Sequence, residues 1–261
     1  KAFDRVAWEK QFVLIEGTGH AGVGSVFDLS NAAVAKLLGS KVVIVSRGGI
    51  GLPIDEVAMN RALFEAEGVE VIGVILNKVL PEKLEYITDF ARRGLKRKGL
   101  ELLGVIPHQP ILSKPTLDLI REELKAEVLA GAGRIHNIVQ RVVIGAMSPA
   151  NVGKLLQPDT LLICPADRED TLAAAAETSI RDEGRLAGII LSDDIHPTPA
   201  ARRLVERFNC PVLFSPEDSY TVASTVHDLT VKTRPDDTQK IKLIQDLIAR
   251  HVNLDRILKA L

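Results

Sequence analysis

The first residues in this chain whose types and spacing could do chemistry are a carboxylate and the glycines after it. The apolar run Phe12–Ile15 leads directly into Glu16, and Gly17, Gly19 and two further glycines follow. Such a run predicts a strand buried on both faces, and ligands of open α/β sheets bind at the carboxyl ends of the strands. We therefore expect Glu16 to point into a ligand crevice, where the glycines let the backbone approach the ligand. The plainer interpretation is a glycine-rich turn beside a solvated acid.

Three more candidate segments end apolar runs. Arg47, Gly48 and Gly49 directly follow one run. Asn77 ends the next, and Pro107 ends a third. Because the carboxyl ends of parallel strands share one edge of a sheet, we expect all four segments to converge on one ligand. They suit phosphate and metal binding, since glycine-flanked loops present N–H groups to anions, a carboxylate can hold Mg²⁺, and an asparagine can pair with a nucleobase.

The elements that must position these residues alternate between strand and helix. This rhythm predicts an α/β fold with a parallel sheet. The expected strands cover residues 12–15, 41–46, 69–76, 102–106, 139–144, 160–164, 186–191 and 211–214. The expected helices cover residues 26–38, 54–67, 82–98, 115–127, 149–156, 171–182, 199–208, 219–227, 236–250 and 254–261.

The small-residue segment Ala130–Gly133 interrupts the rhythm, and a second alternation follows it. A length of 261 residues fits one or two domains. We therefore expect two α/β domains, residues 1–130 and a smaller one of residues 131–261.

The net charge, the apolar runs and the cysteine spacing limit the classes of binding partner that this chain is expected to have. The formal net charge is −1, which gives no electrostatic support for a nucleic-acid or membrane-surface partner. No apolar run approaches the roughly 18 residues of a spanning helix, and the start shows no secretory signal. Cys164 and Cys210 have no metal or redox spacing. We therefore expect a cytoplasmic protein with neither nucleic acid nor membrane as a partner.

Other reactive side chains have plain interpretations. The six histidines show no metal-ligand spacing, and Cys164 is a weak nucleophile candidate because no histidine is placed near it. Arg92 to Lys98 forms a basic helix end, interpreted as a solvated face that complements the helix dipole, with anion binding as the alternative. Asp193 and Asp194 resemble a paired acidic site, but we interpret them as a solvated loop.

The ordered motifs of the first domain resemble a known family. Phe12–His20 is similar to the hydrophobic-Glu-Gly-x-Gly segment of dethiobiotin synthetase and cobyrinic acid a,c-diamide synthase. Val42–Gly51, Gly73–Asn77 and Leu103–Pro107 are similar to further segments of these enzymes. The resemblance implies a P-loop NTPase fold that binds ATP and Mg²⁺.

The resemblance also implies roles for single residues. Glu16 matches the acidic metal ligand of the family, Asn77 matches its adenine-contacting asparagine, and Pro107 lies in its base-binding loop. We add Gly17 and Gly19 to the nucleotide site, and we assign Arg47 to Gly49 to a ligand or substrate loop.

The usual phosphate cradle is not in this sequence. No Gly-x-x-x-x-Gly-Lys-Ser/Thr occurs, and Gly19–Ser25 lacks the lysine. In the family, this lysine comes from an upstream strand. We therefore expect the sequence to begin inside the fold, without that strand and its Walker A loop.

Residues 131–261 resemble the DRTGG domain. Its motif falls at Asp167 and Arg168, and the next three residues, Glu169-Asp170-Thr171, depart from it. The domain pair is similar to the region preceding the catalytic part of some phosphotransacetylases. The resemblance suggests a ligand or interface role for Asp167 and Arg168, against the alternative of a simple helix start. We also expect a symmetric homodimer.

The leading functional hypothesis is a nucleotide-binding regulatory or sensing protein that uses ATP and Mg²⁺. One alternative is an ATP-dependent ligase that activates a carboxylate by phosphoryl transfer. Another is an NADP-binding oxidoreductase, because Gly17–Gly22 matches G-x-G-x-x-G and Arg47 could meet a 2′-phosphate. The third alternative is a non-catalytic dimerisation module.

Overall fold

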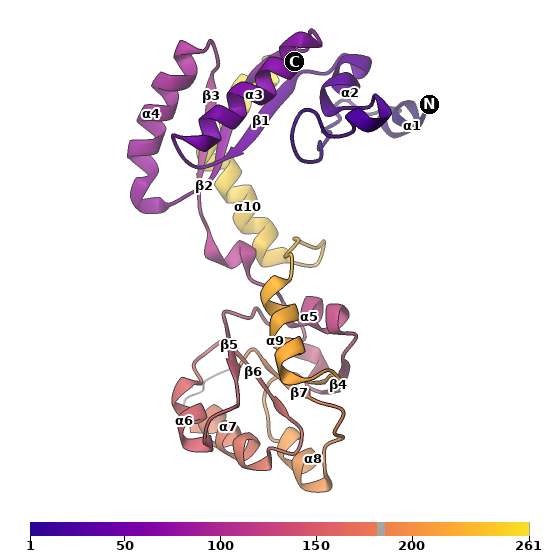
Figure 1. Cartoon of the computed structure of the whole chain (residues 1–261), viewed down its shortest axis with the longest axis vertical. Coiled ribbons are helices and arrows are strands. Elements are labelled where there is room, and N and C mark those ends of the chain that lie inside the picture. Colours follow the sequence, from indigo (N-terminus) through magenta and orange to yellow (C-terminus); the bar gives the residue numbers. More distant parts are fainter. Residues whose placement is uncertain (182–185, 261) are drawn as a thin grey trace. The chain divides into compact units, whose positions relative to one another are not determined.

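The computed structural model describes residues 1–181 and 186–260, which form an α/β fold with two sheets (Figure 1). Contacts divide the chain into two compact units, one of residues 1–108 with 242–261 and one of residues 109–241. The expected helix ends at residues 182 and 261 lie outside the described residues. Within the described part, we find no helix with the length and apolar character that crossing a membrane requires.

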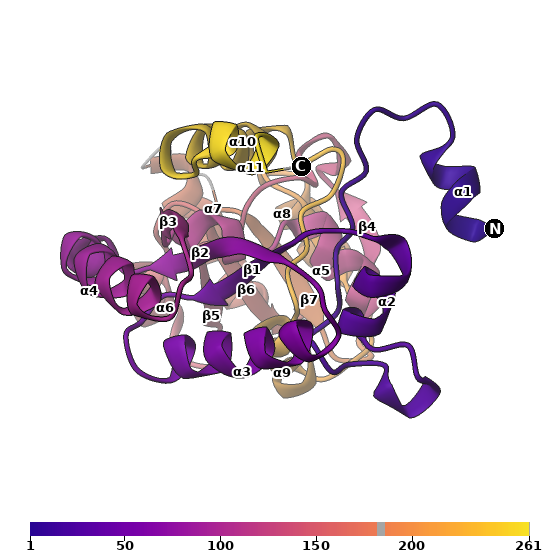
Figure 2. The same cartoon turned by 90° about the horizontal axis from the view of Figure 1, so that it is seen from above.

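The first unit is built on a three-stranded parallel sheet in the order β1-β2-β3. The expected strands form from their apolar runs, as β1 (Val42–Arg47), β2 (Val71–Val79) and β3 (Leu102–Pro107). Figure 2 shows α3 and the end of α10 on opposite faces of this sheet. The helices of the unit are α1 (Ala2–Ala7), α2 (Asn31–Leu38), α3 (Leu52–Ala66), α4 (Leu84–Arg97), the later part of α10 (Thr238–His251) and α11 (Leu254–Leu258).

The core of this unit lies between the sheet and its helices. Val74 and Leu76 of β2 are fully buried and pack with Val57 of α3 and Leu95 of α4. The strands are therefore held by apolar burial against α3 and α4, as continuous Val/Ile/Leu runs of parallel sheets predict.

The expected strand over residues 12–15 is wrong. Residues 12–18 have no regular secondary structure, and Leu14 is 85% exposed. An apolar run becomes a strand only when a neighbouring strand pairs with its backbone groups, and β1 pairs with β2 alone among the described strands. The expected helix from residue 26 begins later, because Ser30 caps α2 by accepting a hydrogen bond from the Ala33 N–H.

The second unit contains a five-stranded sheet in the order β4-β8-β7-β6-β5, in which only β4 runs antiparallel. Its strands are β4 (Glu127–Ala130), β5 (Arg141–Ile144), β6 (Thr160–Pro165), β7 (Gly188–Ser192) and β8 (Val212–Phe214). Its helices are α5 (Leu117–Leu124), α6 (Pro149–Leu155), α7 (Glu169–Arg181), α8 (Pro199–Val205) and α9 (Ser219–Asp228), besides the start of α10.

Side chains of this sheet alternate between two cores. Leu162 of β6 packs in a core with residues of α6, α7 and α8. Its neighbours Leu161 and Ile163 pack in a second core with residues of α5 and α9. Because β5 to β8 lie side by side in chain order, right-handed crossovers place α6, α7 and α8 on one face.

The expected helix over residues 115–127 is too long. α5 ends at Leu124, where Lys125 takes a left-handed conformation with φ 52°. The chain then reverses into β4, whose residue Val128 pairs with Leu213 of β8. A left-handed C-cap is usually glycine, so the lysine at this position gave no sign that the helix stops.

Candidate functional site

The carboxyl edge of the first sheet brings together part of the predicted site. Arg47 and Asn77 are register partners, and the Gly48 N–H donates to the Asn77 carbonyl oxygen at 2.7 Å. Pro107 is the register partner of Val79, two residues beyond Asn77. The loop that contains Gly49 leads from this edge to the start of α3. Four of the predicted positions, Arg47, Gly48, Asn77 and Pro107, therefore lie along one edge, while their roles stay predictions.

The strand β2 is distorted at this edge. Its pairing with β3 shifts between Leu76 and Val79, and Lys78 has a left-handed backbone with φ 59°. The Lys78 N–H donates to Asn77 Oδ1 at 2.8 Å, so the side-chain oxygen of Asn77 already accepts a hydrogen bond from its own chain. Bulges and strained residues concentrate beside binding sites. Lys78 gave no signal in the sequence, because a lysine at the end of a strand is ordinary.

Gly48 allows two strands to approach closely at the same edge. A Cβ at Gly48 would lie 2.4 Å from Val79 Cγ2 and 2.7 Å from Val79 Cα. The loop therefore passes directly over β2 before α3 begins at Leu52. The first turn of α3 follows this loop. Pro53 has no N–H, and the N–H groups of Ile54 and Asp55 both donate to the Gly51 carbonyl oxygen, so this end of the helix offers an anion its dipole.

The glycine-rich segment after Glu16 is held elsewhere. The Asn31 side-chain amide donates to the carbonyl oxygens of Thr18 and His20, both at 2.9 Å. The Ala21 N–H donates to Asn60 Oδ1 at 2.7 Å. Asn60 lies in the middle of α3, about 12 Å along the helix from its first residue at ~1.5 Å per residue. The segment is therefore anchored to the middle of α3, and not to the loop at its start.

Glu16, Gly17 and Gly19 are exposed in this arrangement. Within the described ranges, no group of three or more His, Cys, Asp or Glu side chains is placed to hold a metal ion. Mg²⁺ commonly takes only one or two carboxylates and completes its shell with water and phosphate oxygens. Metal binding by Glu16 is thus compatible with its chemistry and stays a prediction.

The dinucleotide fingerprint lacks its structural context. G-x-G-x-x-G binds a pyrophosphate where a strand turns directly into a helix. Here residues 1–16 contain no strand, and α2 begins only at Asn31. The geometry gives the oxidoreductase alternative no support.

In the second unit, Arg168 connects the loops that follow β5 and β6. Its guanidinium donates to the carbonyl oxygens of Gly145 and Met147, both at 3.4 Å. It also donates to Thr171 Oγ1 and Asp170 Oδ1, both at 2.9 Å. The hydrogen bond from Arg168 lowers the pKa of the Asp170 carboxyl. Asp167, by contrast, is exposed.

A hydroxyl and carboxylate cluster lies beside this loop. Ser192, the register partner of Pro165, is fully buried, and its hydroxyl lies 2.6 Å from the Ser219 hydroxyl. Asp193 Oδ2 accepts hydrogen bonds from both serines, at 3.0 and 3.3 Å. Asp193 lies in the loop after β7, as expected, but it is half-buried and hydrogen-bonded, and its backbone is left-handed, with φ 67°. Asp194 is exposed, as expected.

Cys164 is not available as a nucleophile. Its side chain is fully buried in the core, and burial raises the pKa of its thiol to about 12. Because the thiolate is the reactive form, this cysteine is a core residue at neutral pH.

Comparison with known families agrees with the two-part organisation. Residues 2–116 match the family described as AAA domain, and residues 119–229 match the DRTGG domain. The chain therefore contains an AAA domain followed by a DRTGG domain, which confirms the resemblance drawn from the order of its motifs.

Several phosphate acetyltransferases are similar to this chain over most of its length. The enzyme of Nitratidesulfovibrio vulgaris is 27% identical over 97% of this chain and 37% of its own length. The enzyme of Pseudomonas putida is 30% identical over 92% of this chain and 36% of its own length. The enzyme of Synechocystis is 28% identical over 99% of this chain and 38% of its own length. This chain is thus related to phosphate acetyltransferases and spans just over a third of their length.

A solved structure of the CBS and DRTGG domains of the regulatory region of Clostridium perfringens pyrophosphatase, complexed with the activator diadenosine tetraphosphate, was also found. It is 15% identical, has a TM-score of 0.37, and covers 67% of this chain and 86% of that one. A likeness this low carries no argument about this chain.

Proposed function

We propose that this chain is a nucleotide-sensing region of a phosphate acetyltransferase-related protein. In this proposal, ATP binds at the carboxyl edge of the β1–β3 sheet and its occupancy regulates the protein. The observation that carries the proposal is the register pairing of Arg47 with Asn77, beside the distorted end of β2. Carboxyl edges of parallel strands are where ligands of α/β sheets bind.

Each group at this edge has a role in the proposal. The exposed Arg47 guanidinium pairs with phosphate oxygens, which match its fork of donors. The loop after Gly48 adds backbone N–H groups, and the dipole at the start of α3 favours an anion beside it. Asn77 keeps its side-chain NH₂ free to donate to a base, because among the described residues its amide bonds only through Oδ1. Pro107 lies along the edge as the expected base-binding position.

In this proposal, Glu16 is the ligand of Mg²⁺. This exposed carboxylate would share the ion with phosphate oxygens, as hard cations prefer. The sequence holds no Walker A lysine, so the proposal assigns ATP binding to these residues and assigns them no ATP turnover. In the DRTGG domain, Asp167 and Arg168 provide the loop through which a second ligand or a partner is sensed.

A homodimer formed by the second unit is part of the same proposal. Its edge strand β5 exposes 39% of Val142 and 41% of Ile144, and two-fold dimers are the commonest oligomers. Sedimentation of the whole chain at micromolar concentrations tests this, and a monomer throughout that range would remove the dimer from the proposal.

Calorimetric titration with ATP tests the nucleotide site. We expect saturable binding by the unaltered chain and a loss of roughly tenfold or more in Arg47→Gln, since a charged hydrogen-bonded contact is removed. Arg93→Gln on α4 is the matched control, because Arg93 already pairs with Asp89. No binding by the unaltered chain, or equal losses in both variants, would refute the site.

A further inference from the structure

A groove separate from the proposed nucleotide edge lies along the amino-terminal half of β3. It has a volume of about 450 Å³ and is lined by residues of α4, β3, the last two residues of α10 and the segment that joins α10 to α11. All of these elements belong to the first unit. Small-molecule sites commonly have volumes of ~300–1,000 Å³, so a compact metabolite would fit.

One wall of the groove is fastened to the edge of β3. Gly104 forms an isolated antiparallel bridge with Val252, and the Asn253 N–H donates to the Leu103 carbonyl oxygen at 2.8 Å. A Cβ at Gly104 would lie 2.5 Å from the His251 carbonyl oxygen. The close approach therefore requires glycine and sets this wall firmly against the strand.

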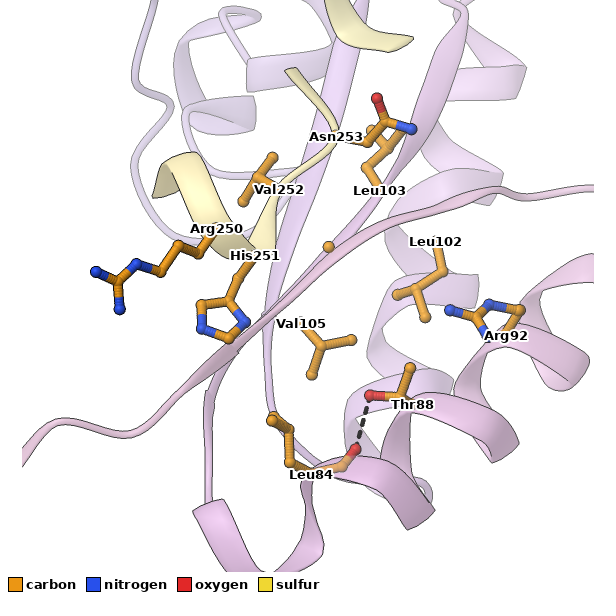
Figure 3. A pocket seen from close by; sticks show the side chains of 11 residues that line it. Leu84, Thr88, Arg92, Leu102, Leu103, Val105, Arg250, His251, Val252 and Asn253 are labelled. Carbon is orange, nitrogen blue, oxygen red and sulfur yellow. Dashed lines mark hydrogen bonds between the residues drawn. The ribbon is translucent and has the colours of Figure 1, made fainter. Parts of the chain in front are cut away.

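The polar groups of the groove are cationic or hydrogen-bonding, and none of its lining residues is acidic. Figure 3 shows the side chains of Arg92 and His251 on opposite sides of Val105, with Thr88 nearby. The Thr88 hydroxyl donates to the Leu84 carbonyl oxygen, so its own oxygen can still accept. Arg250 lies at the rim, and its guanidinium is directed away from the centre.

The arginines of this region differ in whether they have partners. Arg93 pairs with Asp89, and Arg256 donates to Glu101 at 2.9 Å. In the part of the chain that the structure describes, Arg92 and Arg250 form neither an ion pair nor a side-chain hydrogen bond. The two arginines that line the groove thus keep their charge available for a ligand.

We propose that this groove binds a small organic anion. The carboxylate or phosphate group of the ligand pairs with the Arg92 guanidinium, whose fork of donors matches it. The apolar body of the ligand packs on Leu102 and Val105. This site is additional to the proposed nucleotide edge, which lies at the other end of β3.

Phenyl phosphate combines such an anionic group with an apolar body and serves as the probe. Calorimetry on the full chain should show saturable binding, weaker binding of inorganic phosphate, and no detectable binding of neutral benzyl alcohol. Arg92→Gln should weaken phenyl phosphate binding by roughly tenfold or more. Arg93→Gln, one position along α4, and Arg47→Gln, at the proposed nucleotide edge, should keep the affinity within about twofold.

Four results would overturn the proposal. The first is no binding of phenyl phosphate, and the second is binding of benzyl alcohol as tight as that of phenyl phosphate. The third is a loss of phenyl phosphate affinity in Arg93→Gln or Arg47→Gln as large as in Arg92→Gln. The fourth is Arg92-dependent binding of a single-stranded RNA oligonucleotide without binding of phenyl phosphate. Circular dichroism of each variant confirms that it is folded. Because Arg47→Gln reports on the nucleotide edge, failure of that proposal would be seen separately in the ATP titration.

Discussion

Arg47 and Asn77 face each other across the β1–β2 pair at its carboxyl end, and the Gly48 N–H fixes this end to the Asn77 carbonyl oxygen. A guanidinium and a carboxamide thereby share one edge of the sheet, although thirty residues separate them in the sequence. In the proposed nucleotide site, Arg47 is the group for phosphate and Asn77 is the group for the base, so each proposed role can be tested by itself.

Replacing Asn77 with alanine should weaken ATP binding, because the base loses its hydrogen-bond partner. The expected cost is about 1–3 kcal/mol, measured by calorimetry. Asn151→Ala is the matched control, since Asn151 is exposed in the second unit and, among the described residues, its side chain hydrogen-bonds only with the nearby Lys154. Unchanged ATP affinity in Asn77→Ala would remove Asn77 from the site.

Replacing Glu16 with glutamine should lower the magnesium dependence of ATP binding and leave the fold intact. Glutamine keeps the size of the side chain and removes the charge that attracts the ion. ATP titrations with Mg²⁺ and with EDTA measure the effect, and Glu82→Gln, another exposed acid of the first unit, is the control. The same magnesium dependence in Glu16→Gln and the unaltered chain would contradict the assignment.

Two glycine-to-alanine variants should change stability in opposite directions. Gly48→Ala would place its Cβ 2.4 Å from Val79 Cγ2, so overpacking should cost ~1–3 kcal/mol of unfolding free energy. Gly94→Ala, in the interior of α4 with nothing within 4 Å of the new Cβ, should stabilise by about 0.5–1 kcal/mol. Urea unfolding measures both, and an unchanged midpoint in Gly48→Ala would contradict the packing described at this edge.

The two cysteines should resist alkylation in the folded protein. Burial raises the thiol pKa of both Cys164 and Cys210 to about 12, so at pH 8 only about 10⁻⁴ of each is thiolate. Iodoacetamide should label both only in denaturant, as measured by intact mass.

The same pKa shifts make stability depend on pH. Their contribution is complete below the unfolded-state pKa near 9 and falls as pH rises toward 12, because the unfolded thiols ionise first. In the labelling experiment described above, rapid reaction of both cysteines in the native protein would contradict their burial.

The sequence predicted most strands correctly, because each is an apolar run with a partner in the sheet. The run at Phe12–Ile15 has the same composition and forms no strand, since pairing depends on a neighbour that composition does not describe. The edge that holds Arg47 and Asn77 followed from the rule that parallel strands end together. Lys78 and the Ser192–Asp193–Ser219 cluster could not be predicted, because a left-handed lysine and buried hydroxyls have no sequence pattern.

The bridge between Gly104 and Val252 also has a consequence for synthesis. The chain leaves the first unit after residue 108 and returns to it only at residue 242. At translation rates of ~5–20 residues per second, β3 emerges on the order of ten seconds before the segment that covers its edge. A nascent chain in this interval presents an unpaired strand edge, the feature that favours wrong intermolecular pairing, and the second unit can fold completely before the first is closed.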